Sequence, residues 1–101
     1  MAMTVVVTRD APDRFRGFLA SVMLEIAPGV YTAPRMSKAV RERVWSVLEA
    51  WWVGLPGGSV VITWNDPAER SGQAVRTLGL PAVQLHEEDG LFLACRTLKS
   101  E

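Results

Sequence analysis

The chain has 101 residues, of which 49% are hydrophobic and 22% charged, so it is long enough for one hydrophobic core and too short for two. This composition excludes a disordered chain, and the apolar runs are too short to cross a bilayer, so we expect one soluble domain over residues 1–101 without membrane contact. The formal net charge is zero, but residues 1–45 carry seven Lys or Arg against four Asp or Glu, and residues 46–101 carry four against seven, so a polyanionic partner is not excluded.

The first predicted element is a strand over residues 3–8, "MTVVVT", because a β-branched run suits a strand that is buried on both faces. A helix follows, with Asp10 as a candidate cap and Pro12 in the first turn. Apolar residues then recur at three- and four-residue spacing, which predicts one buried helix face: Phe15, Phe18, Leu19, Val22, Met23 and Ile26. The "APG" at 27–29 ends this helix, and a short strand is predicted over residues 29–33.

Ser37 is the predicted N-cap of the longest element, a helix that reaches about Val53. Its apolar residues fall on one side of a helical wheel: Val40, Val44, Val47, Leu48, Trp51 and Leu55. The "PGG" at 56–58 ends the helix. Strands are then predicted over residues 59–64 and 73–79, and a loop over residues 80–90 leads to a last strand over residues 91–98.

This order of elements predicts an α+β fold, a ferredoxin-like sandwich in which two helices cover one face of an antiparallel sheet, with an extra C-terminal strand. The other sheet face stays bare, although "TVVVT" and "SVVITW" offer apolar side chains to both sides. A large apolar face that is exposed to solvent is typical of an interaction surface. We therefore expect a homodimer that forms through the sheets.

Arg14 and Arg16 flank the apolar face where the first helix begins. A helix start offers unpaired backbone N–H groups and a partial positive charge, and two added guanidiniums make a site that suits phosphate oxygens. The alternative interpretation is solvated surface charge, partly neutralised by Asp10 and Asp13.

A second group of basic residues surrounds the start of the long helix: Arg35, Lys38, Arg41 and Arg43. Lys38 and Arg41 are i,i+3 neighbours away from the apolar stripe. Because the same arrangement occurs at two helix starts, it favours contact with a nucleic-acid backbone. An ordinary solvated face explains the group equally well.

Trp45 and Trp52 lie seven residues apart and about 100° or more from the centre of the apolar stripe. Partly exposed tryptophans at this spacing suit contact with a protein partner. The alternative is that loops or the last strand cover them.

The sequence gives little support for catalysis, and we predict no catalytic residue. Asp10, directly after the first strand, is a weak candidate for a metal ligand, because one carboxylate does not make a metal site. The acidic stretch "HEED" at 86–89 is better explained as a solvated loop. Cys95 is the single cysteine, which excludes an internal disulfide and favours a reducing cytoplasm, and we expect no signal peptide.

Short motifs over nearly the whole chain resemble one family in their order and spacing: "VVVT", "RFRG", "GVY", "SKAVRERVW", "VVITW", "TLG" and "DGL". On these motifs the chain resembles the small CRISPR-associated adaptation protein of the Cas-two family, subtype I-E. The resemblance implies a ferredoxin-like homodimer that acts as a scaffold in spacer acquisition, held between two dimers of the Cas-one integrase. The scaffold binds the middle of a double-stranded DNA protospacer, and this role requires no cofactor.

The resemblance also implies roles for particular residues. Arginines of "RFRG" and basic residues at the start of the long helix contact DNA phosphates in such proteins, which maps onto Arg14, Arg16, Lys38 and Arg41. The last strand, residues 91–98, crosses to the other protomer and helps to hold the integrase, so Leu91 and Leu93 join Trp45 and Trp52 as candidate partner contacts.

Two positions depart from the family pattern. Many relatives carry an aspartate at the end of the first strand, proposed to bind magnesium for RNA or DNA cleavage, whereas Arg9 stands there in this chain and Asp10 follows it. A shift of one residue turns a strand side chain to the opposite face. The loop after Gly79 is basic in some relatives but reads "LPAVQ" here, which predicts fewer phosphate contacts.

Two alternative functions remain open at this stage. A magnesium-dependent endonuclease of the same family needs clustered carboxylates at the dimer axis, which Arg9 disfavours. A ferredoxin-like RNA-recognition module needs aromatic residues on central strands to stack on bases, and "TVVVT" has none.

Overall fold

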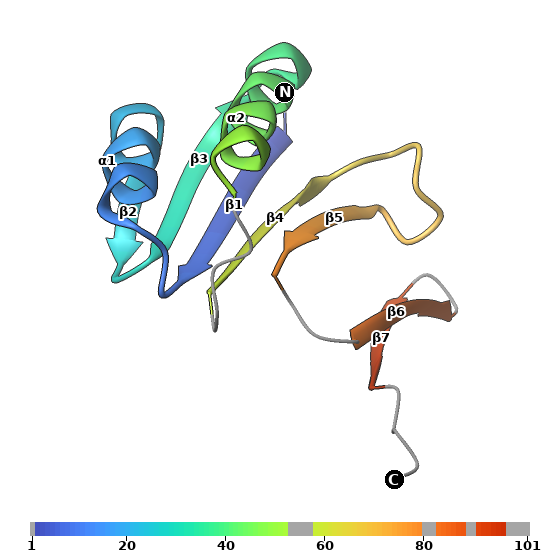
Figure 1. The fold of residues 1–101 in the computed structure, drawn as a ribbon. Helices are drawn as coiled ribbons and strands as arrows, with labels where there is room; N and C mark the ends of the chain where they lie inside the picture. The colour runs from blue at the N-terminus through green and yellow to red at the C-terminus, as the bar shows by residue number, and fades with distance from the viewer. Residues whose placement is uncertain (1, 53–57, 80–82, 89–90, 97–101) are drawn as a thin grey trace, which may run out of the picture.

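The computed structural model describes residues 2–52, 58–79, 83–88 and 91–96. Its elements are β1 (Ala2–Arg9), α1 (Asp13–Val22), β2 (Leu24–Ala27), β3 (Val30–Met36), α2 (Lys38–Trp51), β4 (Ser59–Asn65), β5 (Gln73–Leu78), β6 (Val83–Glu88) and β7 (Leu91–Arg96). Five strands form one antiparallel sheet in the order β2-β3-β1-β4-β5, while β6 and β7 form a separate two-stranded sheet. Both helices lie on the same face of the five-stranded sheet (Figure 1). The predicted α+β fold is confirmed and is consistent with a ferredoxin-like arrangement.

The hydrophobic core lies between the two helices and the sheet. Alternate residues of the central strands point toward the helices, so Val6 and Ile62 are fully buried. The helices meet them with apolar residues four positions apart on one face: Phe15 and Leu19 in α1, and Val44 and Leu48 in α2.

The first helix is shorter than predicted. α1 ends at Val22, and Leu24–Ala27 form the edge strand β2, which pairs with β3. Gly29 in the turn between the strands adopts a φ of +76°, and a Cβ there would lie 2.7 Å from the carbonyl oxygen of Thr8, so this turn requires glycine. The prediction that Ile26 belongs to the buried helix face is wrong, because pairing with β3 places the residue in an edge strand, where it is 60% exposed.

The start of α1 also differs from the prediction. The N-cap is Pro12, which makes no side-chain cap hydrogen bond, so Asp10 does not cap the helix. Asp10 instead adopts a left-handed backbone conformation with φ +52°, which aspartate tolerates better than most residues.

The predicted cap of the second helix is confirmed. The Ser37 hydroxyl accepts a hydrogen bond of 3.2 Å from the backbone N–H of Val40, and the helix ends at Trp51, close to the expected end. Val40, predicted on the apolar side, is 46% exposed, while its neighbour Arg41 is buried. Leu55 lies outside the described residues.

The C-terminal part contains one strand more than predicted. Val83–Glu88 form β6 where a loop was expected, and β6 pairs antiparallel with β7. β7 confirms the last predicted strand as far as Arg96, and residues 97–98 lie outside the described part. In the part that the structure describes, no helix has the length and apolar character needed to span a membrane.

Candidate nucleic-acid interface

Arg14 connects the beginning of α1 to the end of α2. Its Nη2 donates a hydrogen bond of 3.0 Å to the backbone carbonyl of Trp51, and its guanidinium carbon lies 5.1 Å from the centroid of the Trp51 ring. Helix C-termini carry unpaired carbonyls and partial negative charge, so a guanidinium is favourable there. Arg14 is exposed, and its other donors point to no hydrogen-bond acceptor among the described residues.

Arg16 lies on the same end of the helix layer but contacts the β2–β3 hairpin. Its Nη2 is 3.8 Å from Oε2 of Glu25, and its side chain remains 54% exposed. The Tyr31 hydroxyl and then the Glu25 carboxylate raise the pKa of Arg16 above its ordinary value. Burial raises the pKa of the Tyr31 hydroxyl, which forms no hydrogen bond of good geometry although it is completely enclosed. Arg16 is therefore a charged group that is oriented by the hairpin and still reaches solvent.

Asp10 and Arg16 line a common hollow with Thr8 and Gly29. The left-handed backbone at Asp10 follows the last residue of β1, Arg9, so the carboxylate is not part of the strand. Among the side chains of residues 2–52 and 58–79, no three Asp, Glu, His or Cys groups lie closely enough together to hold a metal ion. Asp10 thus shares this hollow with the Arg16 cation, and the described residues place no metal-binding group of side chains around it.

At the start of α2, the two predicted phosphate ligands differ in their exposure to solvent. Lys38 is exposed and makes no hydrogen bond or ion pair with any described residue. Arg41 is only 7% exposed, and its guanidinium carbon lies 4.3 Å from the centroid of the Trp64 ring on β4. The prediction that Arg41 projects from the apolar stripe is wrong, because an aromatic face on the sheet supports the cation inside the core.

The structure does not bring the four predicted phosphate ligands together in one chain. Because Arg14 reaches the C-terminal end of α2, the two helices run antiparallel and their starts lie at opposite ends of the helix layer (Figure 1). The 14 residues of α2 span about 21 Å at the rise of an α-helix. One basic end therefore holds Arg14 and Arg16, and the other holds Lys38.

Three more arginines, which are not among the four predicted phosphate ligands, are exposed at the two basic ends. Arg9 ends β1, Arg35 lies near the end of β3, and Arg43 lies in the second turn of α2. None of the three makes a hydrogen bond or ion pair within the described ranges. The sequence signal for Arg35 and Arg43 was their place in the predicted basic group, but it did not distinguish them from Arg41.

Sequence reasoning also missed a paired charge between α2 and the edge strand β5. Arg76 donates to both carboxylate oxygens of Glu42, over distances of 2.8 and 2.9 Å. The guanidinium carbon of Arg76 also lies 5.2 Å from the centroid of the Trp64 ring, so Arg41 and Arg76 both contact this ring. Glu42 and Arg76 are 34 positions apart in the chain, and only the fold brings them together.

The residues that were predicted to contact a protein partner differ in burial. Trp45 is 6% exposed and belongs to the core, so the prediction of partial exposure is wrong for this residue. Trp52 is half-buried, lies 6.3 Å from Phe15 between ring centroids, and occupies the space that a side chain at Gly79 would need. The side chains of Leu91 and Leu93 lie outside the described residues, although both residues pair with β6.

The sheet face opposite the helices is rich in apolar residues. Val5 and Val7 alternate with the buried Val6 and therefore point away from the helices. Residues directly opposite on neighbouring strands share a face, which places these residues beside them: Leu24, Val30, Thr32, Val61, Thr63 and Val75. Met3 lines a hollow with Val5 and Thr63. We call these nine residues the open face.

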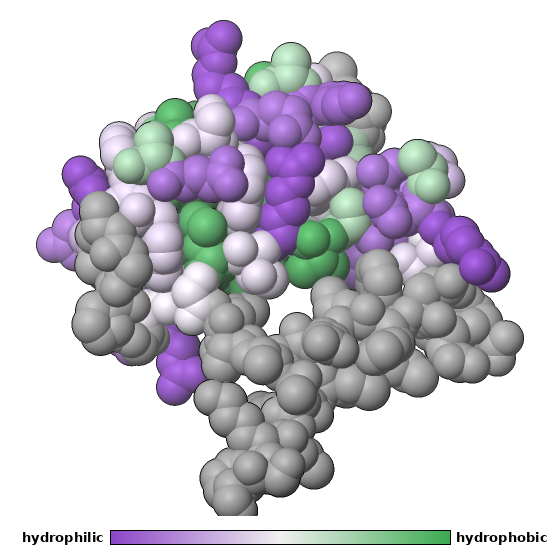
Figure 2. Space-filling view, turned by 45° about the vertical axis from the view of Figure 1, so that its right-hand side comes forward, coloured by the Kyte–Doolittle hydropathy of each residue, from purple (hydrophilic) through white to green (hydrophobic). Residues whose placement is uncertain are grey.

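Much of the open face is accessible to solvent. Met3, Val7 and Leu24 are 54%, 41% and 67% exposed. In the view of Figure 2, by contrast, hydrophilic side chains cover much of the visible surface and hydrophobic ones appear as separate spots. The open face therefore brings seven apolar residues together with Thr32 and Thr63 on one side of the sheet.

The sequence also matches a known protein family. The family described as "CRISPR-associated protein (Cas_Cas2CT1978)" matches residues 3–93. The match covers both helices and the whole five-stranded sheet apart from Ala2, and therefore includes both basic ends and the open face.

Proposed function

This chain belongs to the Cas2-like family of CRISPR-associated proteins, and from that premise we propose that it is a cytoplasmic scaffold of spacer acquisition. In this role two copies form a homodimer that binds the phosphate backbone of a double-stranded protospacer and bridges two dimers of the Cas-one integrase. We propose the I-E subtype for it, on the sequence motifs given above.

The observation that carries the proposal is the pair of basic ends, which carry exposed cations on a chain of zero net charge. Arg9, Arg14 and Arg16 lie at one end, and Arg35, Lys38 and Arg43 at the other. Guanidinium and ammonium groups bind phosphate oxygens without reading the base sequence, which suits a scaffold that accepts protospacers of many sequences. Phosphate binding of this kind needs no metal ion.

The open face supports the dimeric part of the proposal. Burial of apolar surface contributes roughly 25 cal/mol for each Å² removed from water. An open face that spans all five strands offers such a surface, and a twofold axis places the same residues on both sides of the interface. Dimerisation also doubles the number of basic ends that one duplex can contact.

Titration of a short DNA duplex tests the proposed binding. We expect the logarithm of the affinity to fall linearly with the logarithm of the salt concentration, with a slope of about −0.9 for each phosphate contact. The double variant Lys38→Ala and Arg43→Ala removes two exposed cations that have no partner among the described residues, so it reduces the slope without disturbing the fold. Arg70→Ala removes a cation from the β4–β5 turn, outside the residues of the two basic ends, and as a control it leaves the slope unchanged.

Sequence preference and metal dependence complete the test. Duplexes of unrelated sequence bind with similar affinity, and a chelator of divalent cations does not change the result. An unchanged salt slope in the double variant contradicts the role of these cations. Loss of binding with the chelator would instead favour a metal-dependent activity.

A further inference from the structure

Trp51, the last residue of α2, contacts the exposed guanidinium of Arg14 in two ways. The guanidinium carbon lies 5.1 Å from the centroid of the Trp51 ring, within the range of a cation–π contact. Nη2 of the same guanidinium donates a hydrogen bond of 3.0 Å to the backbone carbonyl of Trp51. One residue therefore holds Arg14 both through an aromatic ring and through a carbonyl at the end of a helix, where a cation is favourable.

The Trp51 ring is itself held in place by the first helix. The ring centroids of Phe15 and Phe18 lie 5.8 and 5.5 Å from that of Trp51, and both pairs meet edge to face. Phe15 is fully buried, and Trp51 is half-buried against the same core. Edge-to-face pairs at these distances are favourable and restrict the orientation of the rings. The ring that Arg14 contacts is therefore anchored to the core.

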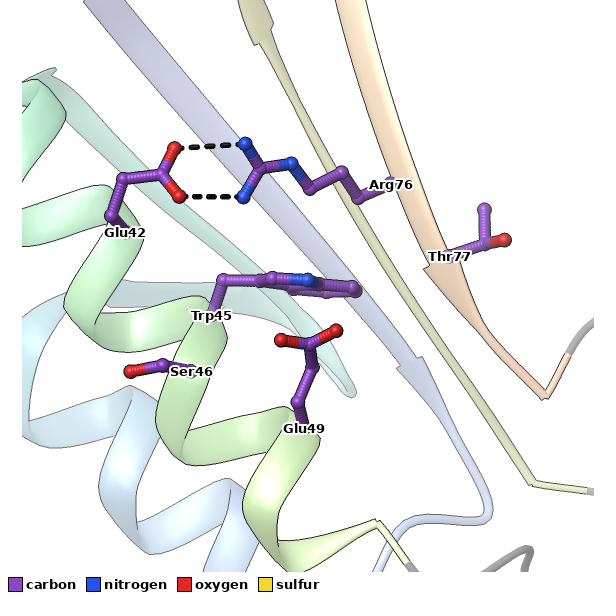
Figure 3. A pocket seen from close by; sticks show the side chains of 6 residues that line it. All are labelled: Glu42, Trp45, Ser46, Glu49, Arg76 and Thr77. Atoms are coloured by element: carbon purple, nitrogen blue, oxygen red, sulfur yellow. Dashed lines mark hydrogen bonds and ion pairs between the residues drawn. The ribbon is translucent and has the colours of Figure 1, made fainter.

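Among the described residues, three arginines contact aromatic rings, and Arg14 differs from the other two. Arg41 and Arg76 contact the Trp64 ring, but Arg41 is buried. Figure 3 shows that Arg76 donates to both carboxylate oxygens of Glu42. Arg14 is exposed and uses one of its five N–H donors on a backbone carbonyl. Its other donors meet no acceptor in the described part of the chain, so they are available to a ligand from solvent.

A side chain that is ordered before binding loses less conformational entropy when a ligand arrives. Because Trp51 already fixes the guanidinium, a phosphate oxygen meets a donor group whose position is set in the free protein. Arg14 supplies the charge, and Trp51 supplies the position. We propose that Trp51 is a positioning residue, which holds Arg14 in place for a phosphate group of the duplex. The inference rests on the proposed function, because it concerns the same basic end.

Titration of the full chain with a short DNA duplex at several salt concentrations tests the inference. Trp51→Leu removes the ring and keeps the arginine, so it weakens the affinity about threefold for each Arg14 that contacts the duplex and leaves the salt slope unchanged. Arg14→Gln removes the charge, so it lowers both the affinity and the slope. In the Arg14→Gln background, Trp51→Leu causes no further loss of affinity, because Trp51 acts through Arg14.

Trp52→Leu is the matched control for the loss of a tryptophan ring. Trp52 is also half-buried and also meets Phe15 edge to face, at 6.3 Å between ring centroids, but Arg14 contacts the Trp51 ring and not that of Trp52. We expect Trp52→Leu to leave the duplex affinity unchanged and circular dichroism to show each variant folded. Trp51→Phe keeps an aromatic ring for the guanidinium, so it retains more of the affinity than Trp51→Leu.

A measurement without DNA separates the inference from the proposed function. The ring current of Trp51 should shift the NMR signals of the Arg14 δ-protons to higher field, and Trp51→Leu should move them toward the values of an unstructured arginine. The inference alone is overturned if this shift is absent, or if Trp51→Leu weakens duplex binding equally with and without Arg14. Failure of the unmodified chain to bind the duplex would overturn the proposed function, and the role of Trp51 in phosphate binding with it, while the shift persists.

Discussion

At the scale of single residues, the position of an arginine decides its role more than its charge does. Arg14 binds the last carbonyl of α2, Arg41 rests on Trp64 inside the core, and Arg43 projects into solvent. A basic residue near a helix start is therefore not by itself a phosphate ligand. The surrounding elements determine how many of its donors are still free for a partner.

Arg14→Gln tests the structural part of that assignment. Loss of the hydrogen bond to the Trp51 carbonyl and of the contact with its ring should lower the free energy of unfolding by about 1 kcal/mol. Urea unfolding followed by tryptophan fluorescence measures the change. Arg43→Gln is the control, and as a surface substitution it should stay within about 0.5 kcal/mol of the unmodified protein. Equal stability of the two variants would leave Arg14 without a structural role.

The pKa of Tyr31 can be measured directly, because Tyr31 is the single tyrosine of the chain. Burial raises its pKa above the ordinary value of 10.0, while the nearby Arg16 guanidinium acts in the opposite direction. The folded state therefore holds the proton more strongly than the unfolded state does. The resulting stability is fully present below pH 10.0 and is lost as the pH rises through the folded pKa.

Ultraviolet absorbance of tyrosinate should give a midpoint above 10.0 in the folded protein and close to 10.0 in denaturant. Arg16→Gln should raise the folded midpoint further, because it removes the group that lowers the pKa of Tyr31. A folded midpoint below the denatured one would contradict the burial of this hydroxyl.

At the scale of elements, the pair of Glu42 and Arg76 joins α2 to a strand that no helix covers. Both side chains are partly exposed, at 41% and 37%, so solvent screens the pair and its contribution is modest. The bidentate geometry of the pair and the contact of Arg76 with the Trp64 ring nevertheless favour a measurable coupling free energy. The pair helps to hold β5 in the sheet.

A double-mutant cycle of Glu42→Gln and Arg76→Gln should give a coupling free energy of ~0.5–1 kcal/mol at neutral pH. Hydrogen bonding to Arg76 lowers the pKa of Glu42 below 4.5, so this stability is present above pH 4.5 and is lost as the pH falls through the folded pKa. Urea unfolding at neutral pH and at pH values below 4.5 measures both effects. Coupling that is absent at neutral pH, or that persists when Glu42 is protonated, would contradict the assignment.

The fold could be predicted from the sequence because its main signals are local. The cap at Ser37, the apolar faces around Phe15 and Leu48, and the β-branched runs each depend on a few neighbouring residues. The spacing of residues 24–26 continues that of α1 and predicts helix, whereas pairing with β3 places them in the strand β2. The burial of Arg41 and the partnership of Glu42 with Arg76 depend on residues from other strands, and no spacing along the chain reports them.

At the scale of the whole molecule, surfaces of different character point in different directions. The open face is apolar, and the two ends of the helix layer carry exposed basic side chains. A neutral total charge conceals this division, which suits the proposed contacts with a second copy of the chain and with a polyanion. Of these surfaces, the open face can be tested without any partner molecule.

Val7→Lys places a charge at the centre of the open face, on the central strand of the sheet, where Val7 is 41% exposed. In a twofold interface each substitution occurs twice, and two buried charges at a cost of at least ~1.5 kcal/mol each weaken the dimer roughly a hundredfold or more. Sedimentation at micromolar concentration should show a dimer for the unmodified chain and a monomer for the variant.

The matched control is Val40→Lys, because Val40 has a similar exposed fraction, 46%, but lies on α2 away from the open face. It should remain dimeric, and circular dichroism should show both variants folded. The salt slope of duplex binding should fall by about half in Val7→Lys, since a monomer presents half as many phosphate contacts. A Val7→Lys protein that stays dimeric would place the interface elsewhere, and the open face would then require a different partner.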